Sequence, residues 1–227
     1  MKVVVLFGLR RSGNHFVINR ILQQFNNHVH LNNVNQFSYD NFIKFKEIPI
    51  KKKTSNGNWI GFKNCDLVCI SCENMLIDTN ELQKFKTNIA DLNVFLLIRC
   101  PFDHFSSVWE VYKKNMKSIE DIMMLWKEYA DIFLDKSNDY LFCKIVYDKF
   151  STDLTYMHKC LQNIADKLVF NDNITIHYQN SSYNDKAKQR KVFSSINTCN
   201  FSHDSQFTKL FDDEFCTKWS AILEVIG

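Results

Sequence analysis

The chain has 227 residues, 45% hydrophobic and 14% aromatic, which is enough for one buried core, and we expect a single domain spanning 1–227. Its 28 basic and 25 acidic residues leave a net charge of +3, so no global field favours a nucleic-acid or membrane surface. No apolar run reaches the length of a membrane span, and no signal peptide precedes the first predicted strand. We therefore expect a cytoplasmic protein without nucleic-acid or membrane partners.

The eight cysteines are expected to be free thiols. Cys69 and Cys72 form a CxxC pair, but no second CxxC and no nearby HxxxH completes the pattern of a zinc site. Buried cysteines commonly serve as small hydrophobic residues. The sequence therefore predicts no metal site, and the thiols indicate a reducing compartment.

The N-terminal segment predicts a strand, a turn and a helix. The apolar run 3–7 leads into a turn bracketed by Gly8 and Gly13, and apolar residues then recur at helical spacing over 17–25. A helix start offers unpaired backbone N–H groups and the positive end of a dipole. Arg10 and Arg11 add fixed charge inside the turn. We predict a cradle for a multiply anionic ligand here.

Strand and helix signals alternate along the rest of the chain. Strands are predicted at 28–31, 59–63, 94–98 and 141–147, and helices at 105–112, 119–133 and 151–164, with a further helix near 215–226. Ser118 is the predicted N-cap of the helix at 119–133, and Asp153 lies at the start of the next one. This alternation predicts an α/β fold with three layers, in which helices flank a central, mostly parallel sheet.

Two common nucleotide-binding motifs do not fit the turn. Gly8 and Gly13 have the separation of a Walker A loop, but Asn14 and His15 stand where that loop requires Lys and Ser or Thr. This disfavours metal-assisted phosphoryl transfer. No G-x-G-x-x-G fingerprint is present. The arginines of the turn instead offer guanidinium groups, which bind phosphate oxygens bidentately.

The turn resembles the loop that PAPS-dependent sulfotransferases use to hold the 5′-phosphosulfate of 3′-phosphoadenosine 5′-phosphosulfate (PAPS). The segment 11–16 reads RSGNHF and matches the family pattern [KR]-S-G-[TN]-[TH]-[WF]. The resemblance implies a P-loop-like fold, with Phe16 against the adenine. It also implies that the cofactor is bound by Arg10, Arg11, Ser12, Gly13, Asn14, His15 and Phe16.

Further elements of the same family follow in order. A strand ending at Arg99, with Ser107 eight positions on, resembles the site for the 3′-phosphate. The segment 145–150, IVYDKF, resembles the element that would place Tyr147 near the amino edge of adenine. The NSSY segment at 180–183 is similar to a further family segment and would bring Ser182 toward the nucleotide. The three stronger matches span 1–165.

The resemblance implies in-line transfer of a sulfuryl group from PAPS to a hydroxyl or amine acceptor, with release of PAP and no requirement for a metal. Arg11 would stabilise the leaving 5′-phosphate. The K-x-H segment of cytosolic members is represented by Lys63 with Cys65 at the histidine position. Asp66 is then the leading candidate for the base that deprotonates the acceptor, with His30 and His15 as alternatives. A small molecule or a carbohydrate is the expected acceptor.

Two other functions stay open on the sequence. A P-loop kinase of a nucleoside or small metabolite would need magnesium and an acidic residue at a strand end, for which Asp148 is the nearest candidate. A catalytically inactive nucleotide-binding protein would keep the cradle without the base. No motif specifies the acceptor or the oligomeric state.

Overall fold

The computed structural model describes residues 1–34, 37–40, 42–43, 65–112, 114–165, 167–170 and 211–226, and the backbone of two short strands at 52–53 and 59–60. Five parallel strands form the main sheet in the order β2-β5-β1-β6-β7. They are β1 (Lys2–Gly8), β2 (His28–Leu31), β5 (Leu67–Glu73), β6 (Leu92–Ile98) and β7 (Cys143–Val146). An antiparallel pair, β3 (Lys52–Lys53) and β4 (Trp59–Ile60), forms a separate sheet. The predicted α/β fold with a parallel central sheet is confirmed.

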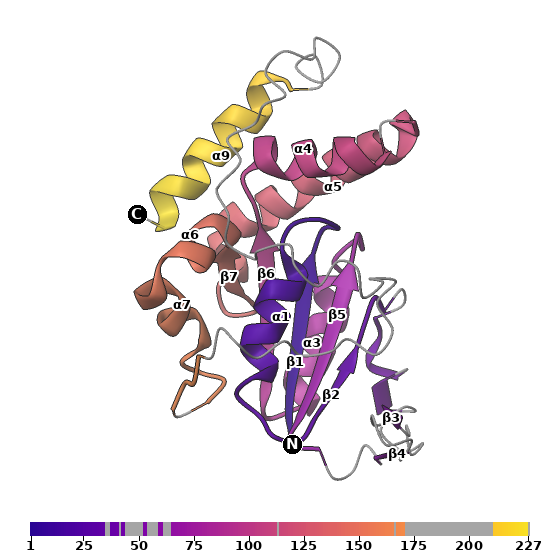
Figure 1. Ribbon diagram of the computed structural model, residues 1–227, viewed down its shortest axis with the longest axis vertical. Coiled ribbons are helices and arrows are strands. Elements are labelled where there is room, and N and C mark those ends of the chain that lie inside the picture. Colours follow the sequence, from indigo (N-terminus) through magenta and orange to yellow (C-terminus); the bar gives the residue numbers. More distant parts are fainter. Residues whose placement is uncertain are drawn as a thin grey trace.

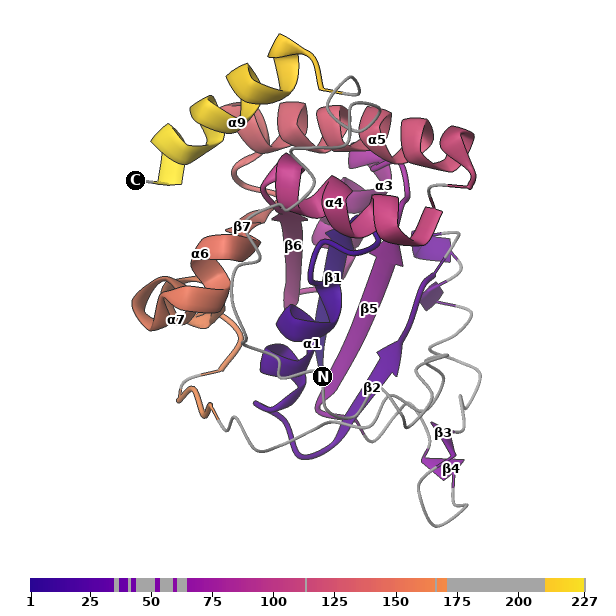
Figure 2. The same ribbon diagram turned by 45° about the horizontal axis from the view of Figure 1, so that its top comes forward.

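Helices cover both faces of the sheet (Figures 1 and 2). Along β1, Val3, Val5 and Phe7 pack on one face and Val4 and Leu6 on the other, as the twofold alternation of a buried strand requires. The face of Val4 is covered by α1 (Asn14–Leu22), α6 (Tyr147–Thr152) and α7 (Leu154–Leu161). The opposite core includes side chains of α3 (Thr79–Asn88), α4 (Pro101–Tyr112), α5 (Met116–Leu134) and α9 (Asp213–Ile226). A 3₁₀ turn, η2 (Lys136–Asn138), follows α5.

The strand β5 and the helix α3 were not predicted from the sequence. β5 lies between β1 and β2, and its residues 67–72 are all buried. Three of its seven residues are cysteine or serine instead of the β-branched residues that are typical of strands. The segment therefore suggested a cluster of thiols and not a strand. Only Leu82 and Phe85 of α3 are buried, which leaves a weak helical period.

The seven cysteines in the described part of the chain are free, as predicted. Burial raises the thiol pKa of both Cys69 and Cys72 to about 12, so these side chains stay neutral and pack as small hydrophobic groups. Cys216 of α9 is exposed, so the expectation that the thiols are buried is wrong for this residue.

Several element boundaries differ from the predictions. β7 ends at Val146, and Tyr147 begins α6 instead of closing the strand. α5 begins earlier than its apolar spacing suggests and is capped by Asn115, whose Oδ1 accepts a hydrogen bond from the backbone N–H of Ser118 at 3.2 Å. Ser118, which was the predicted cap, is therefore the donor of the capping hydrogen bond, and Asn115 is its acceptor. Asp153 caps α7, accepting from the N–H of Tyr156 at 3.0 Å.

Among the described residues, no helix combines the length and apolar character that crossing a membrane requires.

The capping geometry gives a stability test. Asn115→Ala should lower the free energy of unfolding by about 1 kcal/mol, because a backbone N–H in the first turn of α5 loses its partner. Ser118→Ala is the matched control and should change it by less than about 0.5 kcal/mol. Urea denaturation followed by circular dichroism measures both. A larger effect at Ser118 than at Asn115 would contradict the observed cap.

Candidate functional site

The residues predicted to bind an anion meet at the carboxyl edge of the sheet. Gly8, the last residue of β1, pairs in register with Glu73 of β5 and with Leu97 of β6. The strand ends therefore bring the turn after β1 beside Arg99, which follows β6, and Tyr147, which follows β7. The carboxyl ends of parallel strands are the usual ligand site of open α/β sheets.

The turn has two positions at which glycine is required. Gly13 has φ +98°, and a Cβ atom there would lie 2.1 Å from Cε2 of Tyr147. A Cβ atom at Gly8 would lie 1.9 Å from Oδ1 of Asn14. Arg11 also has a left-handed conformation, with φ +69°, which is uncommon for a residue with a side chain. The turn is therefore fixed by its surroundings in a conformation that most sequences avoid.

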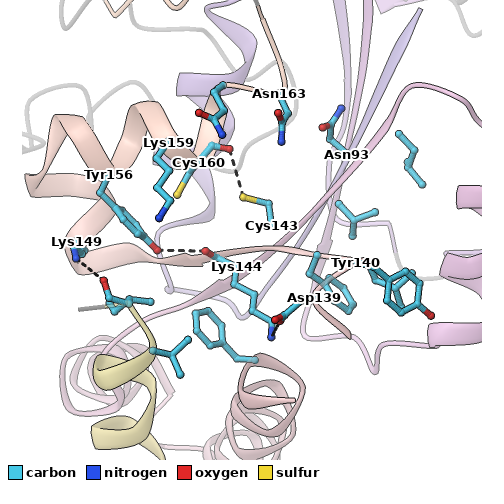
Figure 3. A pocket seen from close by; sticks show the side chains of 18 of the residues that line it. Asn93, Asp139, Tyr140, Cys143, Lys144, Lys149, Tyr156, Lys159, Cys160 and Asn163 are labelled. Carbon is cyan, nitrogen blue, oxygen red and sulfur yellow. Dashed lines mark hydrogen bonds and ion pairs between the residues drawn. The ribbon is translucent and has the colours of Figure 1, made fainter. Parts of the chain in front are cut away.

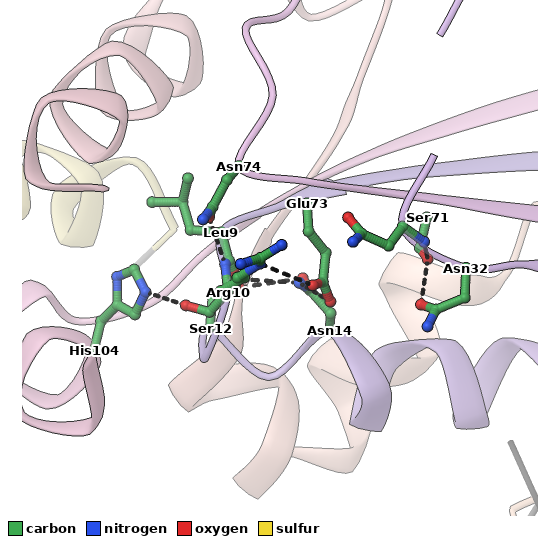
Figure 4. Close-up of polar contacts among 10 residues, drawn as sticks. Leu9, Arg10, Ser12, Asn14, Asn32, Ser71, Glu73, Asn74 and His104 are labelled. Atoms are coloured by element: carbon green, nitrogen blue, oxygen red, sulfur yellow. Dashed lines mark hydrogen bonds and ion pairs between the residues drawn. The ribbon is translucent and has the colours of Figure 1, made fainter. Parts of the chain in front are cut away.

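The side chains of Ser12 and Asn14 face the interior of the loop, not the solvent (Figure 4). Ser12 Oγ donates to the carbonyl of Leu9 at 2.6 Å. Asn14 Nδ2 donates to the same carbonyl at 3.0 Å and to Glu73 Oε1 at 3.2 Å. Ser12 is 1% exposed and Asn14 is 4% exposed, and their hydrogen bonds stabilise the loop. Helix geometry leaves the N–H groups of Gly13 and Asn14 outside the hydrogen-bond ladder of α1, so the loop offers backbone donors to a ligand.

Three of the predicted phosphate-binding side chains are in one connected cluster. Arg11 Nε donates to Ser107 Oγ at 2.9 Å, and Arg99 Nη1 donates to the backbone carbonyl of Arg11 at 3.1 Å. The Arg99 guanidinium lies 5.2 Å from the centre of the Tyr147 ring, a cation–π contact. The segments predicted to hold the 5′ and the 3′ groups thus form a single structural unit.

A cavity of about 820 Å³ lies in front of this cluster. Nine of the residues predicted to bind the nucleotide border it: Arg10, Arg11, Gly13, Asn14, His15, Phe16, Arg99, Ser107 and Tyr147. The other described residues that border it are Asn32, Asn33, Glu73, Val111 and Tyr112. Cavities of roughly 300–1,000 Å³ are typical of small-molecule sites.

Two aromatic side chains stand at one side of the cavity. The rings of Phe16 and Tyr147 are nearly perpendicular, with their centres 6.1 Å apart. Arg20 lies over Phe16 at 5.1 Å. Burial raises the pKa of Tyr147, so its phenol stays protonated and is available as a hydrogen-bond donor.

Glu73 is a functional candidate that the sequence reasoning missed. It is the last residue of β5, and its carboxylate lies at the cavity wall, 3.8 Å from Arg10 Nε and in contact with Asn14. Recognising β5 as a strand would have revealed it, because it then occupies the same edge as the turn.

His15 borders the same cavity and is neutral at pH 7. Burial lowers its pKa, the Glu73 carboxylate opposes this, and the Arg11 guanidinium lowers the pKa further. His30 instead contacts Ser71 Oγ through Nε2 at 3.1 Å and does not border the cavity.

The placement of Asp66 corrects its predicted role. Asp66 precedes β5, and its backbone carbonyl accepts from the N–H of Lys2, at the edge of the sheet opposite the turn. Seven residues of β5 at about 3.3 Å each place it about 20 Å from that turn. This separation is incompatible with proton transfer at the cavity. The predicted site residues Lys63 and Ser182 lie outside the described residues.

A second cavity, of about 690 Å³, lies between α7, the end of α9 and the first residues of β6 and β7 (Figure 3). The Tyr156 hydroxyl donates to the carbonyl of Lys144 at 3.3 Å and accepts from the N–H of Val146 at 3.2 Å. It therefore provides hydrogen-bond partners for one carbonyl and one N–H group of β7. Lys149 Nζ donates to the carbonyl of Ile226 at 2.7 Å and so fixes the end of α9. None of the predicted site residues borders this cavity. Across the described residues, no group of three or more His, Cys, Asp or Glu side chains is placed to hold a metal ion.

Comparison with known proteins finds likeness in structure alone. A sulfotransferase from Alicyclobacillus acidocaldarius aligns over 100% of this chain and 96% of that chain, with 12% sequence identity and a TM-score of 0.53. Mouse sulfotransferase SULT7A1, solved in complex with PAP, aligns over 75% of this chain with 14% identity and a TM-score of 0.47, and the alignment spans 61% of the mouse protein. No protein-family model and no curated protein sequence matches the chain. The likeness to the bacterial structure shows that the chain has a sulfotransferase fold.

A buried histidine beside the turn makes stability depend on pH. His104 of α4 is 0% exposed, and its Nε2 lies 2.7 Å from the carbonyl of Arg10. Burial lowers its pKa from 6.5 to about 4, an effect that the Arg10 carbonyl opposes and that Arg99 and Arg11 reinforce.

Stability should therefore fall as the pH drops from about 6.5 to about 4, because the unfolded chain binds a proton that the folded chain excludes, and it should not depend on His104 above pH 6.5. The contribution of this one group over that window is on the order of 3 kcal/mol. His104→Gln should flatten the dependence, measured as the melting temperature against pH. His158→Gln, at the exposed surface of α7, is the control. Equal slopes for the wild type and the His104 variant would contradict the assignment.

Proposed function

We propose that this protein is a sulfotransferase that transfers a sulfuryl group from PAPS to a hydroxyl or amine on a small molecule or carbohydrate and releases PAP. The observation that carries the proposal is that Arg11 and Arg99, from separate segments, meet at one cavity beside a helix start. A nucleotide phosphorylated at both the 5′ and the 3′ position carries two separate anionic groups. Two permanent cations joined through one backbone carbonyl suit such a ligand.

The contacts divide the cavity between the parts of this ligand. The N–H groups of Gly13 and Asn14, with Arg11, would hold the 5′-phosphosulfate and stabilise the charge that develops on the leaving phosphate. Arg99 and Ser107 would hold the 3′-phosphate. The Arg11–Ser107 hydrogen bond ties these two subsites together. The aromatic side chains of Phe16 and Tyr147 would lie against the adenine.

Glu73 is the proposed base for the acceptor. It is the only carboxylate among the described residues that border the cavity, and its Oε1 accepts a hydrogen bond from the side-chain amide of Asn14 in the loop. A carboxylate at this position can accept the proton that the acceptor loses as its oxygen or nitrogen bonds to sulfur and the bond between sulfur and the 5′-phosphate oxygen breaks. The neutral His15 next to it adds a hydrogen-bonding group without adding charge.

The geometry favours sulfuryl transfer over a kinase reaction. In a Walker A loop, a lysine at the position of Asn14 would reach the β- and γ-phosphates. Here the Asn14 side chain is used inside the loop, where it donates to Leu9 and Glu73. The loop therefore lacks the lysine that neutralises a triphosphate. Arg11 and Arg99 instead suit a ligand whose anionic groups are separated, at the 5′ and the 3′ positions.

Nucleotide preference tests the proposal directly. Calorimetric titration should show PAP binding more tightly than ATP with magnesium or than 5′-AMP. Arg99→Gln should weaken PAP binding by about 10- to 100-fold, the scale of a lost contact between charged groups. Preferential binding of ATP with magnesium would overturn the proposal in favour of a kinase.

Turnover tests the role of Glu73. With labelled PAPS and a panel of carbohydrate, phenol and peptide acceptors, Glu73→Gln should lower kcat by about 100-fold or more while PAP affinity changes little, because glutamine keeps the acceptor of the Asn14 hydrogen bond but cannot take up a proton. Asp66→Asn, about 20 Å away, is the control and should retain wild-type kcat. Tight PAP binding with no transfer to any acceptor would identify a non-catalytic binding protein instead.

A further inference from the structure

His104 links the helix α4 to the turn between β1 and α1. Its ring is fully buried and stacks on Phe105, with ring centres 4.9 Å apart and planes 29° from parallel. Among the described residues, its hydrogen bond crosses to the turn, from Nε2 to the carbonyl of Arg10 at 2.7 Å (Figure 4). The residue therefore bridges two segments that are distant in sequence.

The contact fixes the protonation state of the ring. A backbone carbonyl only accepts hydrogen bonds, so Nε2 must carry the proton. Nδ1 is buried and has no hydrogen-bond partner among the described residues. A neutral imidazole with a proton on Nε2 is the form that satisfies both observations. The N–H group of the His104 ring is thus directed at the turn.

This hydrogen bond acts on the strained part of the loop. The carbonyl and N–H of a trans peptide point in opposite directions, and no cis peptide occurs in the described chain. Holding the Arg10 carbonyl toward α4 therefore directs the N–H of Arg11 away from α4. Arg11 itself has φ +69°, a conformation that persists only where neighbouring groups impose it.

The next carbonyl along the turn is held in the same way. Arg99 Nη1 donates to the carbonyl of Arg11, while His104 donates to the carbonyl of Arg10. Both donors come from the short segment that ends β6 and begins α4. The two bonds flank the left-handed residue and leave its guanidinium directed at Ser107.

We propose that His104 is a positioning residue for the phosphate-binding turn, which keeps the Arg10–Arg11 peptide in the orientation that lets Arg11 and the loop amides bind the 5′ group of the nucleotide. The inference rests on the proposed function, since it takes a 3′,5′-bisphosphorylated nucleotide as the ligand. It predicts that His104 affects the binding of the 5′-phosphate and not that of the 3′-phosphate, although it touches neither.

The test compares the affinities of PAP and 3′-AMP, whose ratio isolates the contribution of the 5′-phosphate. His104→Met removes the donor and keeps an apolar side chain of similar length, and it should lower this ratio about tenfold, the scale of one hydrogen bond to the turn. His104→Gln keeps an N–H donor and should retain the ratio within about threefold. Ser106→Ala is the matched control, because Ser106 is also buried in α4 but donates to the carbonyl of Phe102 within the helix.

An unchanged ratio in His104→Met, whether both affinities fall equally or neither changes, would overturn the proposal. A purely structural role lowers stability without selecting one phosphate. If His104→Met does not fold, ¹⁵N NMR of histidine-labelled wild-type protein decides the point. A proton on Nε2 at pH 7, both without ligand and with PAP, is the expected result, and a proton on Nδ1 overturns the proposal. Failure of the proposed function is distinguishable, because the wild-type protein would then itself show no preference for PAP over 3′-AMP.

Discussion

The site depends on the parallel pairing of β1 with both β5 and β6. This register aligns Gly8 with Glu73 on one side and with Leu97 on the other, so three chain segments leave the sheet at one edge. The core on both faces fixes the register, because a shift of one residue would turn the buried side chains of β1 to the opposite layer. Hydrophobic packing thus sets the position of charged groups that contribute nothing to the core themselves.

Polar side chains then fix the shape of the loop that leaves this edge. Ser12 and Asn14, which match the sulfotransferase motif, are used to close the loop on Leu9 and Glu73 and are buried. Their presence in the motif therefore reflects the shape of the backbone as much as contact with a ligand. The loop includes Arg11 in a left-handed conformation. These hydrogen bonds, and those that Arg99 and His104 donate from the segment after β6, stabilise that conformation.

The sequence was sufficient for the parts of the molecule that have a clear period or spacing. The strand β1, the turn and the helix α1 were predicted because an apolar run, two glycines and a helical repeat follow one another. β5 was missed because cysteine and serine occupy a fully buried strand, and Glu73 was missed with it. Asp66 was predicted as the base because Cys65 stands at the histidine position of the K-x-H segment, and this resemblance does not show at which edge of the sheet the residue lies. His104 was overlooked because a histidine on the apolar face of a helix has no sequence signal of its partner.

Arg10 and Arg99 each have an acidic residue nearby, but neither guanidinium forms a close ion pair with it. Arg10 lies 3.8 Å from Glu73 and Arg99 lies 3.9 Å from Asp148, both beyond hydrogen-bonding distance. The pKa of Asp148 is raised, chiefly by burial, even though the N–H of Cys100 and the Arg99 guanidinium favour its charged form. Had Arg99 been engaged in a close, bidentate pair, the carboxylate would be strongly stabilised and the pKa lowered. Arg99 borders the cavity, and its Nε has no hydrogen-bond partner among the described residues. The protein itself leaves this cation partly satisfied, which is why we propose an anionic ligand for it.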